Sequence, residues 1–197
     1  ISAGYRLSYP DEKLFMFYLD EFETKLFDLP EGVYTCLIEN EDCEEQILTP
    51  GMDDEIFSRT KVPMTKNEVR VLSISRLELT KKAVVYDVGS GTGSVSAECA
   101  RLSPDIAVFA IEQKEEAANL TKENAVRLGL SDQIMVINKK APEGFEELPT
   151  PTHVFIGGSS GALSDILSAI QKKLIVKENT KGVRVVINAV SLETIAQ

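Results

Sequence analysis

The 197-residue sequence has few of the residues that form disulfides or bind structural metal ions: it contains three cysteines and one histidine. Cys36, Cys43 and Cys99 are odd in number and lack metal-ligand spacing. This pattern excludes a disulfide framework and favours a reducing compartment. We expect all three to be small buried or half-buried side chains, and we predict a cytoplasmic protein without a metal site.

Long apolar runs and an excess of basic residues are also missing. No stretch approaches the roughly 18 apolar residues of a membrane span, and no signal peptide is visible at the start. The 31 acidic residues outnumber the 21 Lys and Arg residues, so the formal net charge is −10. General nucleic-acid binding relies on neutralising phosphates, so this charge argues against it while leaving room for a local basic patch. We predict neither a membrane nor a nucleic-acid partner.

The most informative stretch runs from residue 83 to residue 96. Residues 84–88 (VVYDV) are mostly β-branched or aromatic and predict a short buried strand. Gly89, Gly91 and Gly93 then end the strand, and the residues behind them suit the start of a helix. Strand, glycine turn and helix open a doubly wound α/β fold, in which ligands bind at the carboxyl end of the strand.

Two acidic residues indicate which ligand this turn suits. The pattern is Asp87-x-Gly89-x-Gly91-x-Gly93 rather than the G-x-G-x-x-G of dinucleotide folds. A carboxylate here would repel a pyrophosphate and suit a cationic ligand such as S-adenosylmethionine, which carries a sulfonium and an α-amino group. Glu112 ends the next predicted strand, about 20 residues after the last glycine, where an acid can accept hydrogen bonds from ribose hydroxyls. The alternative is an ordinary strand-to-helix turn with a solvated Glu112.

Strands and helices alternate through the rest of the chain. Further strands are predicted at residues 106–111, 134–138, 153–156 and 183–189, with helices at 115–128 and 162–174. This alternation predicts a doubly wound, mostly parallel sheet with helices on both faces. A complete sheet of this class has two further strands, so we expect the sequence to be short at its C-terminus. No internal repeat or low-complexity segment is visible.

Residues 1–45 do not follow this alternation, and we expect them to form a small α+β unit with a linker, followed by an α/β domain at 46–197. A helix is predicted from apolar residues at helical spacing, namely Phe15, Tyr18, Leu19, Phe22 and Leu26. A strand is predicted at 33–38, and the acidic run from Glu39 to Glu45 is the expected linker. Further on, Thr65 and Glu68 stand in capping-box register and predict a helix that starts after Thr65.

Three further runs make the sequence resemble a known family: residues 51–57 (GMDDEIF), 61–66 (KVPMTK) and 155–161 (FIGGSSG). With the glycine turn, they are similar to the decarboxylating precorrin methyltransferases of cobalamin biosynthesis, which are class I S-adenosylmethionine-dependent enzymes. The similarity covers about residues 50–197. Residues 7–12 and 37–40 resemble the C-terminal part of a tetrapyrrole C(5)-methyltransferase, which occurs fused to this enzyme in precorrin-6Y C(5,15)-methyltransferases. We therefore expect a piece of such a fusion, consistent with a start at Ile1.

The resemblance implies C(15) methylation of a precorrin or cobalt-precorrin, with decarboxylation of its ring-C acetate and S-adenosylmethionine as cofactor. It implies cofactor contacts at Thr65, Asp87, Gly89, Ser90, Gly91, Thr92, Gly93, Glu112, Gln113, Ala141 and Gly157. It places the tetrapyrrole substrate at Lys61, Met64, Lys66, Gly158 and Ser159. It also implies a homo-oligomer, specifically a tetramer. No general acid or base is assigned.

Some positions depart from the family pattern. Lys140 stands where relatives usually carry an acid near the adenine, which leaves the Ala141 backbone as the better contact. His153 also replaces an acid, and at the start of a strand it suits a structural or solvated role rather than that of a base. Near residues 61–66, we expect some of the basic residues Arg59, Lys61, Lys66 and Arg70 to line the site and counter substrate carboxylates. The alternative is a solvated basic helix start.

Two other function classes stay open. One is a class I methyltransferase that acts on RNA or on a protein side chain. The acidic charge and the missing N/D-P-P-Y motif argue against methylation of base amino groups. The other is a non-catalytic binding or assembly module, since a shortened sheet can fail to hold a cofactor.

Overall fold

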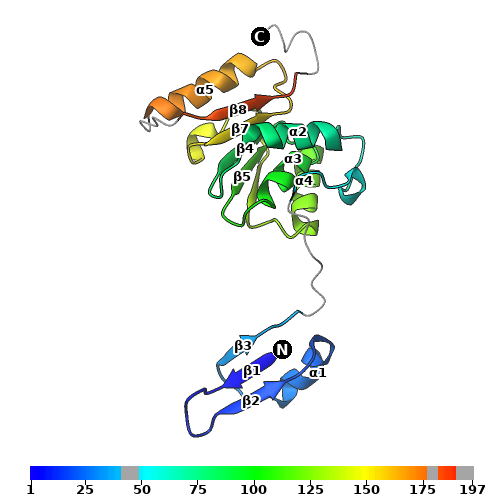
Figure 1. Ribbon diagram of the computed structural model, residues 1–197, viewed down its shortest axis with the longest axis vertical. Coiled ribbons are helices and arrows are strands. Elements are labelled where there is room, and N and C mark those ends of the chain that lie inside the picture. Colours follow the sequence, from blue (N-terminus) through cyan, green and yellow to red (C-terminus); the bar gives the residue numbers. More distant parts are fainter. Residues whose placement is uncertain (41–48, 177–181, 190–197) are drawn as a thin grey trace. The chain divides into compact units, whose positions relative to one another are not determined.

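The computed structural model describes residues 1–40, 49–176 and 182–189 (Figure 1). The chain divides into two compact units, Ile1–Ile47 and Leu48–Gln197, and each is described by itself. The acidic run beyond residue 40, Cys43 and the chain after residue 189 lie outside the described residues.

The first unit is a three-stranded antiparallel sheet in the order β2-β1-β3. Its strands are β1 (Ser2–Tyr5), β2 (Lys13–Met16) and β3 (Tyr34–Leu37). Between β2 and β3 lie three short helical turns, η1 (Leu19–Glu21), α1 (Phe22–Lys25) and η2 (Leu26–Asp28). The strand predicted at 33–38 is confirmed.

The long helix predicted from Phe15 to Leu26 is wrong. Residues Lys13–Met16 pair along the whole of β1, so their backbone groups are satisfied by a sheet rather than by a helix. The ring of Phe15 then packs beside Tyr34, with centroids 6.3 Å apart. The apolar spacing therefore combines a strand residue, Phe15, with the three short helical turns of residues 19–28, and these two periodicities together imitate one long helix.

The second unit is built on a five-stranded parallel sheet in the order β6-β5-β4-β7-β8. The strands are β4 (Val84–Val88), β5 (Ala107–Ile111), β6 (Ile134–Ile137), β7 (His153–Ile156) and β8 (Arg184–Ile187). The helices are η3 (Asp54–Ile56), α2 (Asn67–Leu77), α3 (Ser94–Ala100), α4 (Glu115–Arg127), η4 (Phe145–Glu147) and α5 (Leu163–Val176). The predicted doubly wound α/β fold is confirmed.

Helices cover both faces of this sheet, as Figure 1 shows. Val85 packs in one core cluster with residues of α2, α3 and α4. Its neighbour Tyr86 packs in a second cluster with residues of α5. Successive strand residues point to opposite faces, so a sheet covered on both sides needs nearly continuous apolar strands, which explains the run at 84–88.

The strand order places an opening beside the central strand β4. After β4 the chain builds β5 and β6 on one side, and then crosses over to add β7 and β8 on the other. The carboxyl ends of β4 and β7 therefore form the topological switch point of the sheet, which is where open α/β sheets bind ligands.

The predicted cap at Thr65 is wrong. Helix α2 begins at Asn67, with Lys66 at its N-cap position and no side-chain cap hydrogen bond. The Lys66 carbonyl accepts the first helical bond from Arg70 N at 2.8 Å. The Thr65 carbonyl instead accepts a hydrogen bond from the Arg70 side chain at 2.8 Å, so Thr65 belongs to the segment that precedes the helix.

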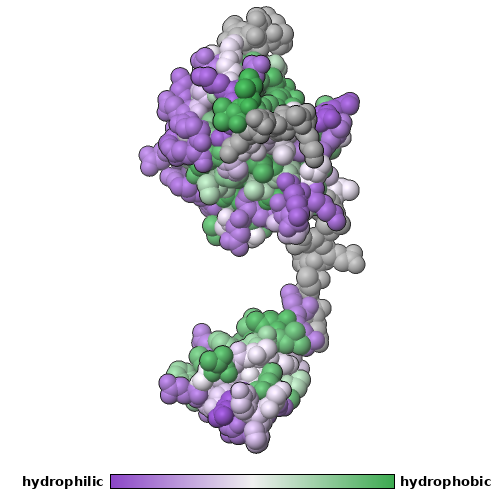
Figure 2. All heavy atoms as spheres, turned by 90° about the vertical axis from the view of Figure 1, so that its left-hand side faces the viewer, coloured by the Kyte–Doolittle hydropathy of each residue, from purple (hydrophilic) through white to green (hydrophobic). Residues whose placement is uncertain are grey.

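Hydrophobic side chains are exposed on the first unit, as Figure 2 shows. Leu14 and Met16 of β2 and Leu37 of β3 pair with Gly4 or Ser2 of β1, so they share one sheet face, and all three are exposed. Across residues 1–40, 49–176 and 182–189, no helix combines the length and apolar character needed to span a membrane.

Candidate cofactor and substrate site

A cavity of about 470 Å³ opens at the carboxyl ends of β4, β5 and β7. Its volume lies in the range of about 300–1,000 Å³ that is typical of small-molecule sites. Its walls come from the glycine turn, the segment 61–66, the ends of β5 and β6 and the loop after β7. The lining residues are Val62, Pro63, Met64, Thr65, Lys66, Val69, Val88, Gly89, Ser90, Gly91, Ile111, Glu112, Gln113, Lys114, Ala117, Lys139, Lys140, Ala141, Gly157, Gly158, Ser159, Ser160 and Asn188.

The glycine turn lies close to two other walls of the cavity, the loop after β7 and the segment 61–66. Gly89 and Gly91 adopt φ angles of 74° and 58°, which are costly for residues with a side chain. A Cβ atom on Gly89 would lie 2.7 Å from the Gly158 carbonyl oxygen, and one on Gly91 would lie 2.9 Å from the Pro63 carbonyl oxygen. Only glycine therefore allows the turn to approach the loop after β7 and the segment 61–66.

Glu112 lies at the end of β5, lines the cavity and is largely buried. Its Oε2 accepts a hydrogen bond from Gly91 N at 3.1 Å, and its Oε1 accepts one from Lys114 N at 2.9 Å. These bonds hold the carboxylate against the glycine turn, where the sequence predicted an acid.

Asp87 lies on the other side of the turn. It is 1% exposed, does not line the cavity, and its Oδ2 accepts a hydrogen bond from Ser96 Oγ of α3 at 2.5 Å. Burial raises the pKa of Asp87 to about 6; the Ser96 hydrogen bonds oppose the rise and the charge of Glu112 adds to it. Among the described residues, Oδ1 of Asp87 is a buried oxygen without a hydrogen-bond partner.

Most predicted site residues lie together. Eight predicted cofactor residues line the cavity: Thr65, Gly89, Ser90, Gly91, Glu112, Gln113, Ala141 and Gly157. Four predicted substrate residues also line it: Met64, Lys66, Gly158 and Ser159. Asp87, Thr92, Gly93 and Lys61 are not part of the lining. Asp87 and Thr92 are buried beneath the turn, Gly93 is the N-cap of α3, and Lys61 is exposed.

The expected basic rim is only partly present near residues 61–66. Of the four candidates, Lys66 lines the cavity, while Arg59 and Lys61 lie outside the lining. Arg70 is fully buried, so it cannot face a substrate at the mouth. Its guanidinium instead donates hydrogen bonds to the carboxylates of Glu98 and Asp54 and to the backbone carbonyl of Thr65.

Other basic residues were missed as part of this rim. Lys114, Lys139 and Lys140 join Lys66 in the lining, which contains one acidic residue, Glu112. The lining thus holds more basic than acidic side chains although the chain carries a net charge of −10, but two of these lysines have acidic partners outside the lining. Lys66 pairs with Asp54 at 3.4 Å and Lys139 with Glu147 at 3.6 Å. Each of the three missed lysines follows the carboxyl end of β5 or β6 by two or three residues. Applying the strand-end rule to every strand would have found them, and Asn188 after β8 as well.

His153 lies away from the cavity, at the start of β7. It is 7% exposed, and its Nδ1 lies 2.8 Å from Thr152 Oγ1. Burial lowers the pKa of His153. This environment fits the structural role predicted for it.

Comparison with known proteins adds a family to this geometry. The model of a family described as "Precorrin methyltransferase domain" matches residues 55–197. The "Probable cobalt-precorrin-6B C(15)-methyltransferase (decarboxylating)" of Pyrobaculum calidifontis is 41% identical over 149 residues, which cover 75% of this chain and 73% of that protein.

Two solved structures are similar as well. The precorrin-6Y C5,15-methyltransferase of Geobacter metallireducens aligns with a TM-score of 0.68 at 36% identity, covering 75% of this chain and 74% of that one. A precorrin 8w decarboxylase of Methanobacterium thermoautotrophicum aligns with a TM-score of 0.67 at 35% identity, covering 74% of this chain and 75% of that one.

Proposed function

Because the chain belongs to the precorrin methyltransferase domain family, we propose that it methylates C(15) of a precorrin or cobalt-precorrin in cobalamin biosynthesis. The names of its relatives describe them as decarboxylating, and the carboxylate lost in this proposal is that of the ring-C acetate. One observation carries the proposal beyond the names. The cavity at the switch point joins a glycine turn, a carboxylate at the end of β5 and a basic rim.

The residues present fit S-adenosylmethionine as cofactor. When bound, this cofactor supplies an electrophilic methyl group on a sulfonium. Glu112 would accept hydrogen bonds from the ribose hydroxyls, and the backbone of Gly89 and Gly91 would allow close approach. Asp87 does not line the cavity, but its negative charge beneath the glycine turn favours a cationic group over a phosphate there.

The contribution of the protein to catalysis is alignment and charge. The cavity walls would orient the methyl group of the cofactor toward a substrate at the cavity mouth, and orientation is worth up to roughly 7–11 kcal/mol in model reactions. Lys66, Lys114, Lys139 and Lys140 would balance the carboxylates of a tetrapyrrole substrate, which explains a basic rim on an acidic protein. No group in the cavity is assigned as a general acid or base.

Three further predictions belong to this proposal. Residues 1–45 are a remnant of a tetrapyrrole C(5)-methyltransferase domain with its linker, joined to the methyltransferase domain at 46–197. The exposed sheet face of Leu14, Met16 and Leu37 supports this assignment, because a part of a larger domain exposes surface that the whole would cover. The protein acts as a homo-oligomer, a tetramer, in the cytoplasm.

The test has a binding step and a reaction step. Titration calorimetry with S-adenosylhomocysteine should show binding to the wild-type chain, and Glu112→Gln should weaken it, because the neutral amide is a weaker acceptor. Incubation with a cobalt-precorrin and S-adenosylmethionine should then yield a methylated, decarboxylated product by mass spectrometry. Absence of nucleoside binding would favour an assembly module, and methylation of RNA or protein instead would favour another class I methyltransferase.

A further inference from the structure

We propose that Arg70 is a positioning residue: its buried guanidinium fixes the segment 61–66 as a wall of the cavity and thereby sets the affinity for the cofactor. This inference rests on the proposed function. It starts from an observation that the basic rim does not explain, namely a fully buried arginine next to the site.

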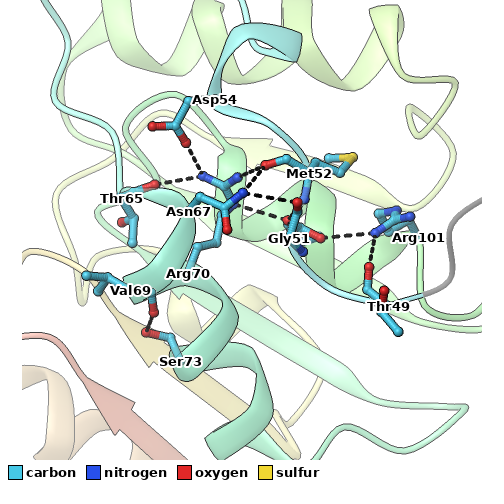
Figure 3. A network of polar contacts seen from close by, with 11 residues as sticks. Thr49, Gly51, Met52, Asp54, Thr65, Asn67, Val69, Arg70, Ser73 and Arg101 are labelled. Carbon is cyan, nitrogen blue, oxygen red and sulfur yellow. Dashed lines mark hydrogen bonds and ion pairs between the residues drawn. The ribbon is translucent and has the colours of Figure 1, made fainter.

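The guanidinium of Arg70 connects three parts of the chain, as Figure 3 shows. Its Nε donates to Glu98 Oε1 at 3.2 Å. Its Nη1 donates to Asp54 Oδ1 at 3.0 Å and to the Thr65 carbonyl at 2.8 Å. Its Nη2 donates to the Met52 carbonyl. One side chain of α2 therefore holds both ends of the connection from Met52 to Thr65.

Glu98 of α3 is the buried counterpart of Arg70, and it is also fully buried. Its Oε1 accepts hydrogen bonds from Gly51 N at 2.9 Å and Met52 N at 2.7 Å. Its Oε2 pairs with Arg101 Nη1 at 3.2 Å. The carboxylate thus anchors the start of the same connection to the helix that follows the glycine turn.

The segment held by Arg70 is in contact with the cofactor site. Thr65 and Lys66 line the cavity, and so does Pro63, whose carbonyl oxygen abuts Gly91. Displacement of the Thr65 carbonyl would therefore move the wall against the glycine turn. A shift of about 1 Å at such a site can change rates by about two orders of magnitude.

Stability alone is a poor explanation for this arrangement. A buried ion pair gains little over apolar residues of similar volume, because desolvation of both charges offsets their attraction. What a guanidinium offers is geometry, since its planar fork can donate to several acceptors at once in fixed directions. A lysine keeps the charge, but its single ammonium group cannot reach acceptors on all sides of that plane.

Arg101 provides a matched control. It pairs with the same carboxylate at the same distance of 3.2 Å, and it also donates to a backbone carbonyl, that of Thr49, at 2.8 Å. Among the described residues, no hydrogen bond or ion pair joins Arg101 to the segment 61–66. Arg101→Lys therefore perturbs the buried network without loosening the wall.

The experiment compares Arg70→Lys with Arg101→Lys in the full chain. We expect Arg70→Lys to weaken S-adenosylhomocysteine binding about tenfold, the effect of losing one charge-assisted hydrogen bond, and to raise the cofactor KM more than it lowers kcat. Arg101→Lys should bind S-adenosylhomocysteine with an affinity within about twofold of wild type, even if urea denaturation shows that it loses as much stability as Arg70→Lys. Equal binding by all three proteins, or weakening that merely follows the loss of stability, would overturn the assignment.

A milder pair keeps the inference testable if Arg70→Lys does not fold. Asp54→Asn removes one charged acceptor of Arg70 and leaves the Glu98 pair, whereas Asp53→Asn changes an exposed neighbour. Asp54 also pairs with Lys66 Nζ at 3.4 Å, so Lys66→Gln, which breaks that pair and leaves Arg70 intact, is a second control and should increase exchange less than Asp54→Asn. Of the two aspartate variants, only Asp54→Asn should increase hydrogen exchange at residues 61–66 and weaken nucleoside binding. Identical exchange in both aspartate variants would refute the positioning role. A wild-type protein that binds no nucleoside would instead refute the proposed function.

Discussion

Ionisation of Asp87 should make the stability of the α/β unit depend on pH. Burial raises the pKa of this carboxyl group from an ordinary 3.8 to about 6. Between these values the folded protein holds a proton that the unfolded chain has released. The free energy of unfolding therefore decreases as the pH rises through this window, and it stays lower above pH 6.

The size of the effect follows from the shift in pKa. Each unit corresponds to about 1.36 kcal/mol, so the full loss is about 3 kcal/mol, of which about 1.4 kcal/mol falls between about pH 5 and 7.5. The side chain of the Asp87→Asn variant cannot ionise, so its free energy of unfolding should not decrease in this way as the pH rises. The absolute stability of the variant at one pH is less informative, because an amide nitrogen at the Oδ1 position would be a buried donor without a partner, at a cost of about 1–3 kcal/mol.

The assay is urea denaturation at these two pH values, followed by circular dichroism because the chain has no tryptophan. Relative to Asp87→Asn, the wild type should lose about 1.4 kcal/mol between the lower and the higher pH. Asp132→Asn, at an exposed position, should keep the wild-type pH dependence. Parallel stability curves for wild type and Asp87→Asn would refute the argument that burial of this carboxyl group controls its proton.

Two further predictions concern the cavity walls. Gly91→Ala should lower stability by about 1–2 kcal/mol and weaken nucleoside binding, because its φ is positive and its Cβ would meet the Pro63 carbonyl; Gly158→Ala should leave thermal stability unchanged, since no atom lies within 4 Å of its Cβ. Lys66→Glu should raise the tetrapyrrole KM about tenfold by placing a negative charge in the lining. The control Lys61→Glu, outside the lining, should change that KM little, and equal effects would contradict the assigned wall.

Local patterns sufficed for much of the fold. Five apolar runs predicted the five strands of the sheet, because a strand buried on both faces must be apolar throughout. The spacing of Gly89 and Gly91 after the first of these strands predicted the turn, and Glu112 was expected near it. The prediction failed in the first unit, where the pairing of Lys13–Met16 with β1 overrides the helical spacing of the aromatic residues.

The candidate site was predictable where a residue's place in a strand determines its position. Residues at strand carboxyl ends, such as Glu112 and Gly157, converge in any parallel sheet and line the cavity. Asp87 is different, because the alternation of side chains along β4 turns it toward α3. Whether this face of the strand borders the cavity or is buried depends on how α3 packs against it, which the strand pattern does not predict. The role of each lining residue in binding stays a prediction.

By itself, the sequence determined a parallel α/β sheet, its glycine turn and an acid beyond the next strand, because each depends on neighbours within a few positions along the chain. Only the tertiary structure decided that Arg70 is buried rather than a surface cation, because its partner Glu98 is 28 residues away on another helix. For the basic rim, the strand-end rule reaches Lys114, Lys139 and Lys140 from the sequence, whereas only the assembled sheet brings Lys66, from the segment before α2, beside them.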